Sequence, residues 1–173
     1  MMRLDLLRDF ARYDRWATER VLAAADRLPD ADYRGDVGLF FKSVHGTLNH
    51  LLVAQHQLWF RRFAFGESPR VELDAEVETD RQRLRAALLD GCDAWGGLVA
   101  GLDDARLSGR LDYTTMRGQA VSLPYAATLL HVFNHGTHHR GQISAGVTRL
   151  GHECPVLDMV AMLQSEAAAH RSV

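Results

Sequence analysis

The sequence predicts an all-α protein, a four-helix bundle with a small β-hairpin before the fourth helix and a short helix at the C-terminus. Apolar residues recur every three or four positions over most of the 173 residues, and glycine and proline separate four long stretches. The helical period is lost only between the third and fourth stretches. With 47% hydrophobic residues the chain can bury one ordinary core, so we expect a single domain over residues 1–173.

The first two predicted helices cover residues 4–28 and 40–65. Seven apolar residues of the first recur at helical spacing: Leu6, Phe10, Tyr13, Ala17, Val21, Ala24 and Leu28. Pro29 follows directly and ends that helix. The second helix, FFKSVHGTLNHLLVAQHQLWFRRFAF, is apolar on more than one side, which predicts burial against several neighbours, and it should stop near Gly66 and Pro69.

The third predicted helix spans residues 73–101, because this stretch begins with acidic residues, which the helix macrodipole favours, and ends in glycines, which suit a frayed C-terminus. Residues 109–123, GRLDYTTMRGQAVSL, alternate apolar and polar positions around a turn, which predicts a β-hairpin. Pro124 can occupy the first turn of a fourth long helix that continues to Gly151. Residues 157–169 complete the chain as a short helix.

Composition excludes several classes of partner. The net charge is -2 and the basic residues are scattered among acidic ones, so we expect no nucleic-acid partner. Cys92 and Cys154 have neither metal-type spacing nor the density of a disulfide scaffold, which predicts free thiols. Neither a signal-peptide core nor an apolar stretch of membrane-spanning length is recognisable, so we expect no membrane partner and a cytoplasmic location.

Four of the nine histidines lie in HVFNHGTHHRGQI, residues 131–143. His131, His135 and His139 are four residues apart and line one helix face, whereas His138 lies about 60° to its side. Two imidazoles at i and i+4 can bind one ion at about 2.1 Å, and a third ligand must then come from another helix. His135 with His139 is the favoured pair, while His131 and His138 are more simply explained as hydrogen-bonded or surface residues.

Candidates for the third ligand lie on the second helix: His45, His50 and His56. On a helical wheel, His50 shares its face with small and polar residues, namely Ser43, Gly46, Ala54, Gln57 and Arg61, and the other two histidines point away from it. Such a face fills core space poorly but suits the wall of a ligand pocket.

A resemblance supports this selection. The histidine-rich segment, the upstream TLNHLL, the stretch YTTMRGQAVSLPYAATLLHV and the N-terminal FARYDRWATERVL resemble the DinB family of damage-inducible bacterial proteins over nearly the whole chain. The resemblance implies a four-helix bundle, usually a homodimer, with a divalent metal, typically zinc or nickel, held by three histidines. The matching positions here are His50, His135 and His139. Relatives in the wider superfamily, such as mycothiol-dependent maleylpyruvate isomerase and bacillithiol transferases, use such sites for thiol chemistry.

Three neutral imidazoles leave the ion its positive charge and an open position, where water or a thiol would be deprotonated near neutral pH. We therefore expect a thiol S-transferase-like enzyme that joins a low-molecular-weight thiol to an electrophilic small molecule. Gln57 and Gln142 are candidates for orienting metal-bound species, and Arg61 for binding a substrate carboxylate. The alternatives are a metal-dependent hydrolase, which lacks the glutamate of an H-E-x-x-H motif, and a non-catalytic metal-binding stress-response protein.

Overall fold

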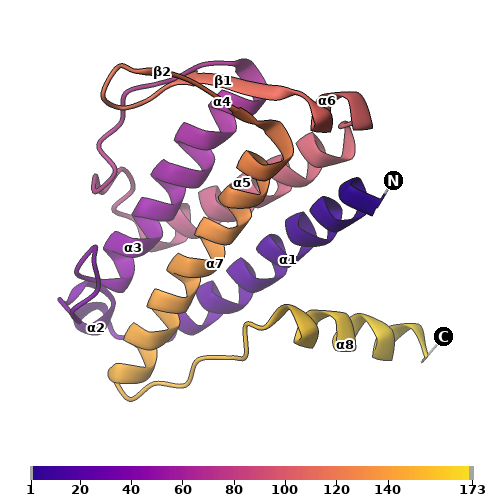
Figure 1. Cartoon of the computed structure of the whole chain (residues 1–173). Coiled ribbons are helices and arrows are strands. Elements are labelled where there is room, and N and C mark those ends of the chain that lie inside the picture. Colours follow the sequence, from indigo (N-terminus) through magenta and orange to yellow (C-terminus); the bar gives the residue numbers. More distant parts are fainter. Residues whose placement is uncertain (1, 172–173) are drawn as a thin grey trace.

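The computed structural model describes residues 2–171 and confirms the mostly helical fold with a hairpin and a C-terminal helix (Figure 1). The long helical segments are α1 (Met2–Ala25), a continuous segment formed by α3 (Val44–Leu51), η1 (Leu52–Trp59) and α4 (Phe60–Phe65), then α5 (Arg81–Ala100) and α7 (Tyr125–Arg149). The remaining elements are α2 (Asp30–Arg34), α6 (Asp104–Ser108), β1 (Arg110–Thr114), β2 (Ala120–Pro124) and α8 (Met159–His170). The short helices α2 and α6 were not predicted.

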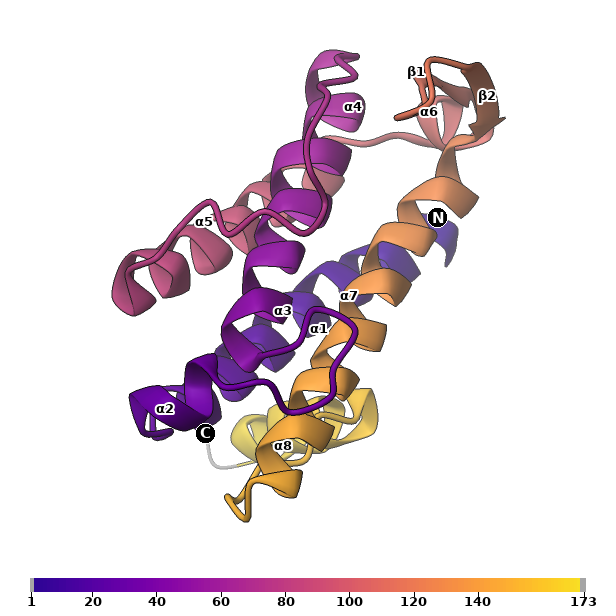
Figure 2. The same ribbon diagram turned by 90° about the vertical axis from the view of Figure 1, so that its left-hand side faces the viewer.

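The long helices pack around a shared interior. Helix α1 contacts α5 and α7, and η1 also contacts α5 and α7, while α3 lies beside α7 (Figure 2). The antiparallel pair β1 and β2 lies at one end of the bundle and leads into α7, and α8 returns to α1 (Figure 1). No helix within residues 2–171 is long and apolar enough to cross a membrane.

Three apolar clusters form the core of the described residues: two large ones, which a polar layer separates, and a small one formed by Tyr13, Ala17 and Met162. One large cluster includes Val21, Leu48, Leu88 and Ile143, and the other includes Leu7, Trp95, Leu129 and Phe133. Along α1, the buried Asp14 lies between the residues of one large cluster and those of the other. Along α7, the buried His139 and Arg140 also lie between residues of the two large clusters. The histidine-rich segment therefore contributes His139 and Arg140 to this polar layer, whereas its residues Val132, Phe133 and Ile143 belong to the apolar clusters.

The second long helix begins at Val44 rather than at residue 40. The Oγ atom of Ser43 accepts a hydrogen bond from the backbone N–H of Gly46 at 2.9 Å, which caps the helix. The preceding residues form a tight turn closed by a bridge between Leu39 and Lys42, and Lys42 has a left-handed φ of 65°. The prediction of a helix from residue 40 was wrong because a capping serine and a turn occupy its first residues.

The third long helix begins at Arg81, so the prediction that it begins at residue 73 was wrong. Asp80 caps it by accepting a hydrogen bond from the N–H of Arg83 at 2.8 Å. Residues 66–80, which we call the 66–80 segment, contain no helix. Asn49 anchors this segment, since its side chain accepts from the N–H of Glu78 at 2.9 Å and donates to the carbonyl of Glu78 at 3.0 Å.

The middle of the second long segment, η1, is a π-helix, which sequence periodicity did not predict. Its hydrogen bonds span five residues instead of four, so each turn is wider and the following side chains are rotated around the axis. Gln57 and Arg61 therefore depart from the α-helical wheel that placed them on the face of His50. π-Helical turns of this kind are frequent at functional sites.

Candidate metal centre

Three imidazoles from two helices converge in the polar layer. The Nε2 atom of His135 lies 3.4 Å from Nε2 of His50 and 3.0 Å from Nε2 of His139. The potential ligand atoms of all three residues lie within 4.8 Å of one another. An ion with tetrahedral ligands at about 2.1 Å separates neighbouring ligand atoms by about 3.4 Å. The spacing of these nitrogens therefore fits a single metal ion.

The hydrogen bonds of the outer ring nitrogens direct the inner ones toward such an ion. Nδ1 of His50 lies 2.7 Å from the carbonyl oxygen of Leu73, which can only accept, so this nitrogen carries the proton. Nδ1 of His139 lies 2.8 Å from Oε1 of Gln142 and donates in the same way. The Nε2 atoms of both rings then present lone pairs to His135. A single N–H on Nε2 of His135 can donate fully to only one of these two lone pairs. A metal cation, in contrast, can bind the lone pairs of all three Nε2 atoms.

The electrostatics keep the three rings neutral. Burial, and then the neighbouring imidazoles, lower the pKa of His135 to about 3. Burial lowers the pKa of His139 to about 4 against the opposing hydrogen bond from Gln142, and burial also lowers the pKa of His50. Metal binding requires neutral imidazole. Because the pKa values of these histidines are lowered, the folded chain keeps the candidate ligands neutral at ordinary pH.

A pH dependence follows for the metal-free protein. The folded state resists protonation of His135 and His139 down to pH 3–4, whereas in the unfolded chain both titrate near 6.5. The unfolded state therefore binds more protons between these values, and the free energy of unfolding should decrease as the pH falls from 6.5 toward 4. Urea denaturation of metal-free protein at several pH values measures this slope. The His135→Ala variant should show a shallower slope, and an equal slope would contradict the assignment.

A cavity of about 440 Å³ opens beside the histidines. It is lined by Phe40, Phe41, His50, Leu73, Asp74, His138, His139 and Gln142. The ring of Phe41 stacks on that of His50 with centroids 3.8 Å apart, so the tight turn before α3 covers one side of the site. A small molecule in this cavity would touch two of the three histidines.

The other candidates from the sequence occupy different places. The side chain of Gln142 is hydrogen-bonded to His139, so it orients that imidazole ring instead of a metal-bound species. Neither Gln57 nor Arg61 lines the cavity, and the guanidinium of Arg61 pairs with Glu67 instead. Asp74 was not among the predicted site residues, because its segment was expected to be helical.

The remaining histidines of the motif lie outside the group of three. The ring of His131 packs edge-on against Trp59 at a centroid distance of 5.5 Å. His138 lines the cavity, and its ring lies 4.8 Å from that of His139. On the second long helix, His45 is buried beside Asn49, with 3.2 Å between His45 Nε2 and Asn49 Nδ2.

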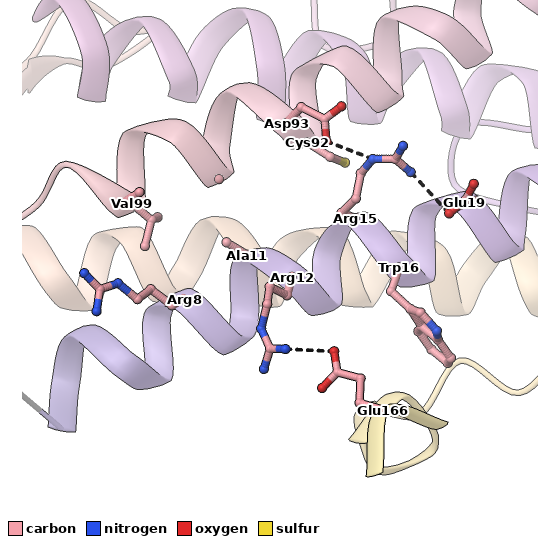
Figure 3. A pocket seen from close by; sticks show the side chains of 12 residues that line it. Arg8, Ala11, Arg12, Arg15, Trp16, Glu19, Cys92, Asp93, Val99 and Glu166 are labelled. Atoms are coloured by element: carbon pink, nitrogen blue, oxygen red, sulfur yellow. Dashed lines mark hydrogen bonds and ion pairs between the residues drawn. The ribbon is translucent and has the colours of Figure 1, made fainter. Parts of the chain in front are cut away.

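A wider groove of about 670 Å³ lies between α1 and α5, beside α8 (Figure 3). Its arginines face acidic neighbours: Arg12 bonds to Glu166 at 2.8 Å and Arg15 to Asp93 at 2.9 Å. None of the three converging histidines lines this groove. Its charges are compensated, and the groove offers no comparable set of ligands.

Fold and site together define a helical-bundle protein with a three-histidine group that can hold a metal ion. The chain belongs to the DinB family, whose model matches residues 1–171. No curated protein matches the chain. The family match confirms the resemblance carried by the histidine-rich segment and by the N-terminal helix.

Proposed function

We propose that this DinB-family chain is a metal-dependent enzyme that transfers a low-molecular-weight thiol to an electrophilic small molecule. The observation that supports this most directly is the convergence of His50, His135 and His139 beside an open cavity. Closed structural zinc sites use four protein ligands, whereas catalytic sites use three and keep one position free. Three imidazoles next to a cavity correspond to the catalytic arrangement.

A divalent ion held by these histidines, with zinc or nickel as the expected metal, would lower the pKa of a thiol in its open position and stabilise the thiolate. The carbonyl of Leu73 and the side chain of Gln142 hold two of the rings by their outer nitrogens. Phe41 covers His50 and restricts access of water from that side. The protein thus supplies orientation and a partly dry environment for the reaction.

The proposed reaction is a nucleophilic substitution. The thiolate sulfur attacks the electrophilic carbon, a C–S bond forms, and the leaving group, such as chloride, departs with the electron pair of its bond. The thiol proton passes to a base or to solvent. Asp74 and His138 both line the cavity and are the side chains placed to accept it.

Asp74 also supports a second candidate, a metal-dependent hydrolase. The absence of an H-E-x-x-H motif counted against hydrolysis in the sequence. In the structure the 66–80 segment brings a carboxylate to the cavity wall, where it could accept a proton from water. Hydrolysis requires no thiol, so the two functions predict different reactants.

The test begins with untagged protein, because polyhistidine tags import nickel. Elemental analysis should give about one divalent ion per chain. The protein should consume a low-molecular-weight thiol only when a chlorinated aromatic electrophile is present, and chelation should abolish this reversibly. Ester hydrolysis without thiol would identify the hydrolase instead. Metal binding without either reaction would leave a non-catalytic metal-binding protein.

The external thiol, rather than a cysteine of the protein, should be the nucleophile. Burial raises the pKa of the Cys92 thiol well above its ordinary value, and the side chain is 2% exposed. Cys154 packs at the edge of an apolar cluster and does not line the cavity. The Cys92→Ala, Cys154→Ala double variant should therefore keep its metal and its rate of thiol consumption. Loss of turnover with metal still bound would contradict the external-thiol mechanism.

A further inference from the structure

A buried carboxylate connects the two helices that carry the histidines. Asp14 of α1 is 0% exposed and Arg140 of α7 is 2% exposed, so both charges lie in the interior. A buried charge is tolerated only when it is paired and hydrogen-bonded. Oδ1 of Asp14 accepts from Nη1 of Arg140, and Oδ2 accepts from Nε2 of Gln55 in η1 at 2.7 Å. One side chain therefore bonds to both histidine-bearing segments.

Both bonds end close to the site. Arg140 directly follows His139, and Gln55 lies five residues after His50 in the same continuous helical segment. The contact lies in the polar layer between the two large apolar clusters, and the small cluster of Tyr13, Ala17 and Met162 joins α1 to α8 only. Hydrophobic packing within these clusters therefore does not by itself fix the distance between the histidine-bearing helices at this level. Hydrogen bonds to a shared carboxylate can fix it.

Gly136, the residue after His135, shows how closely the helices approach. A Cβ atom at this position would lie 2.6 Å from Oε1 of Gln55 and 2.9 Å from Oδ1 of Asp14. Side-chain atoms do not approach one another so closely, so any larger residue would displace this contact. The absence of a side chain at Gly136 allows the polar groups of α1 and η1 to lie directly against α7.

We infer that Asp14, Gln55 and Arg140 form a positioning device that fixes His50 relative to the pair His135 and His139. The inference rests on the proposed metal centre. A productive ligand set must hold its geometry to about 0.5 Å. The Nε2 atoms belong to two separate helices, so their spacing depends on whatever joins those helices at this level.

The first test removes the link to η1 without removing a charge. Gln55→Leu should weaken zinc binding about tenfold, as is typical when groups that orient ligands are removed. Competition with a chromophoric chelator measures the affinity, and the absorption spectrum of the cobalt-substituted protein should change with the ligand geometry. Cys92→Ala is the matched control, because Cys92 also contacts Asp14, at 3.5 Å, but joins α1 to α5. This control should bind zinc like the parent.

The second test separates positioning from stability. Replacing both charges, in Asp14→Leu with Arg140→Met, leaves no unpaired buried ion, and such replacements often preserve or raise stability. The buried amide of Gln55 loses its acceptor in this variant, which costs about 1–3 kcal/mol. The double variant should therefore still fold without metal, with stability lowered by no more than the loss of this one buried hydrogen bond, yet bind zinc at least tenfold more weakly. Asp26→Leu with Arg85→Met, which removes a partly buried pair joining the chain after α1 to α5, should keep the parental affinity.

Zinc affinity within threefold of the parent in Gln55→Leu and in the double variant would overturn the inference. Should the double variant fail to fold, Gln55→Leu decides alone, because it leaves the ion pair intact. A parent protein that binds no divalent metal would contradict the proposed function itself. A parent that binds metal, with variants that bind it equally well, would contradict only the positioning role.

Discussion

Replacing His135 with alanine should remove stoichiometric metal from the protein. Its Nε2 is within 3.4 Å of the corresponding atoms of both His50 and His139, so this ring is the shared neighbour in the group. Its loss leaves two imidazoles, which is one fewer than catalytic zinc sites use, and we expect the affinity to decrease at least about 100-fold. Elemental analysis of untagged protein after dialysis measures the bound metal.

The chain provides matched controls on the same helix. His131→Ala and His138→Ala remove the same chemical group, one turn before His135 and one residue before His139, and should leave about one ion per chain. Full retention of metal by a His50→Ala, His135→Ala double variant would refute the site. If His131→Ala empties the site and His139→Ala does not, the ion lies one turn earlier on α7.

Much of this site could be predicted because its ligands follow helical periodicity. Histidines four residues apart on one helix lie on one face whatever surrounds them, so spacing identified the row His131, His135 and His139. The resemblance to the DinB family then supported the pair His135 and His139. His50 could be selected because small and polar neighbours share its face. It lies before the π-helix, so the helical wheel still holds for the neighbours that precede it.

The rest of the site depends on contacts that leave no periodic pattern. The bond from His50 to Leu73 uses a backbone carbonyl, so the identity of residue 73 carries no signal. The π-helix changes the angular spacing of the side chains, so an α-helical wheel misplaces Gln57 and Arg61, and neither lines the cavity. Asp14 and Arg140 are 126 residues apart in the chain, and only the fold brings them together. Gln142 was detectable, since it lies three residues from His139 on the same helix face.

The acidic run before α5 was compatible with two structures. Acidic residues favour the first turn of a helix, which predicted a helix from residue 73. They are equally compatible with an extended segment that ends at a capping aspartate, and the structure has this second arrangement with Asp80 as the cap. The difference matters for function, because the extended 66–80 segment brings Leu73 and Asp74 to the candidate metal centre.

The close approach of η1 and α5 predicts that Gly91→Ala will strongly destabilise the fold. A Cβ atom on Gly91 would lie 2.3 Å from Nδ1 and 2.4 Å from Cγ of His56. Rotating the ring about its own axis cannot relieve the contact with Cγ, because this atom is fixed to the Cβ of His56. Either the side chain leaves its position or the helices separate, and we expect a cost of about 3 kcal/mol.

Thermal unfolding of the metal-free protein tests this, and the midpoint should fall by about 6–12 °C for a chain of this size. Gly97→Ala on the same helix is the control, since nothing lies within 4 Å of a Cβ there and alanine favours the helix by about 0.5–1 kcal/mol. Adding His56→Ala to Gly91→Ala removes the obstructing ring and should recover part of the loss, because the new methyl group then occupies vacated space. If Gly91→Ala melts like the parent, η1 and α5 are not in the close contact that the structure shows between Gly91 and His56.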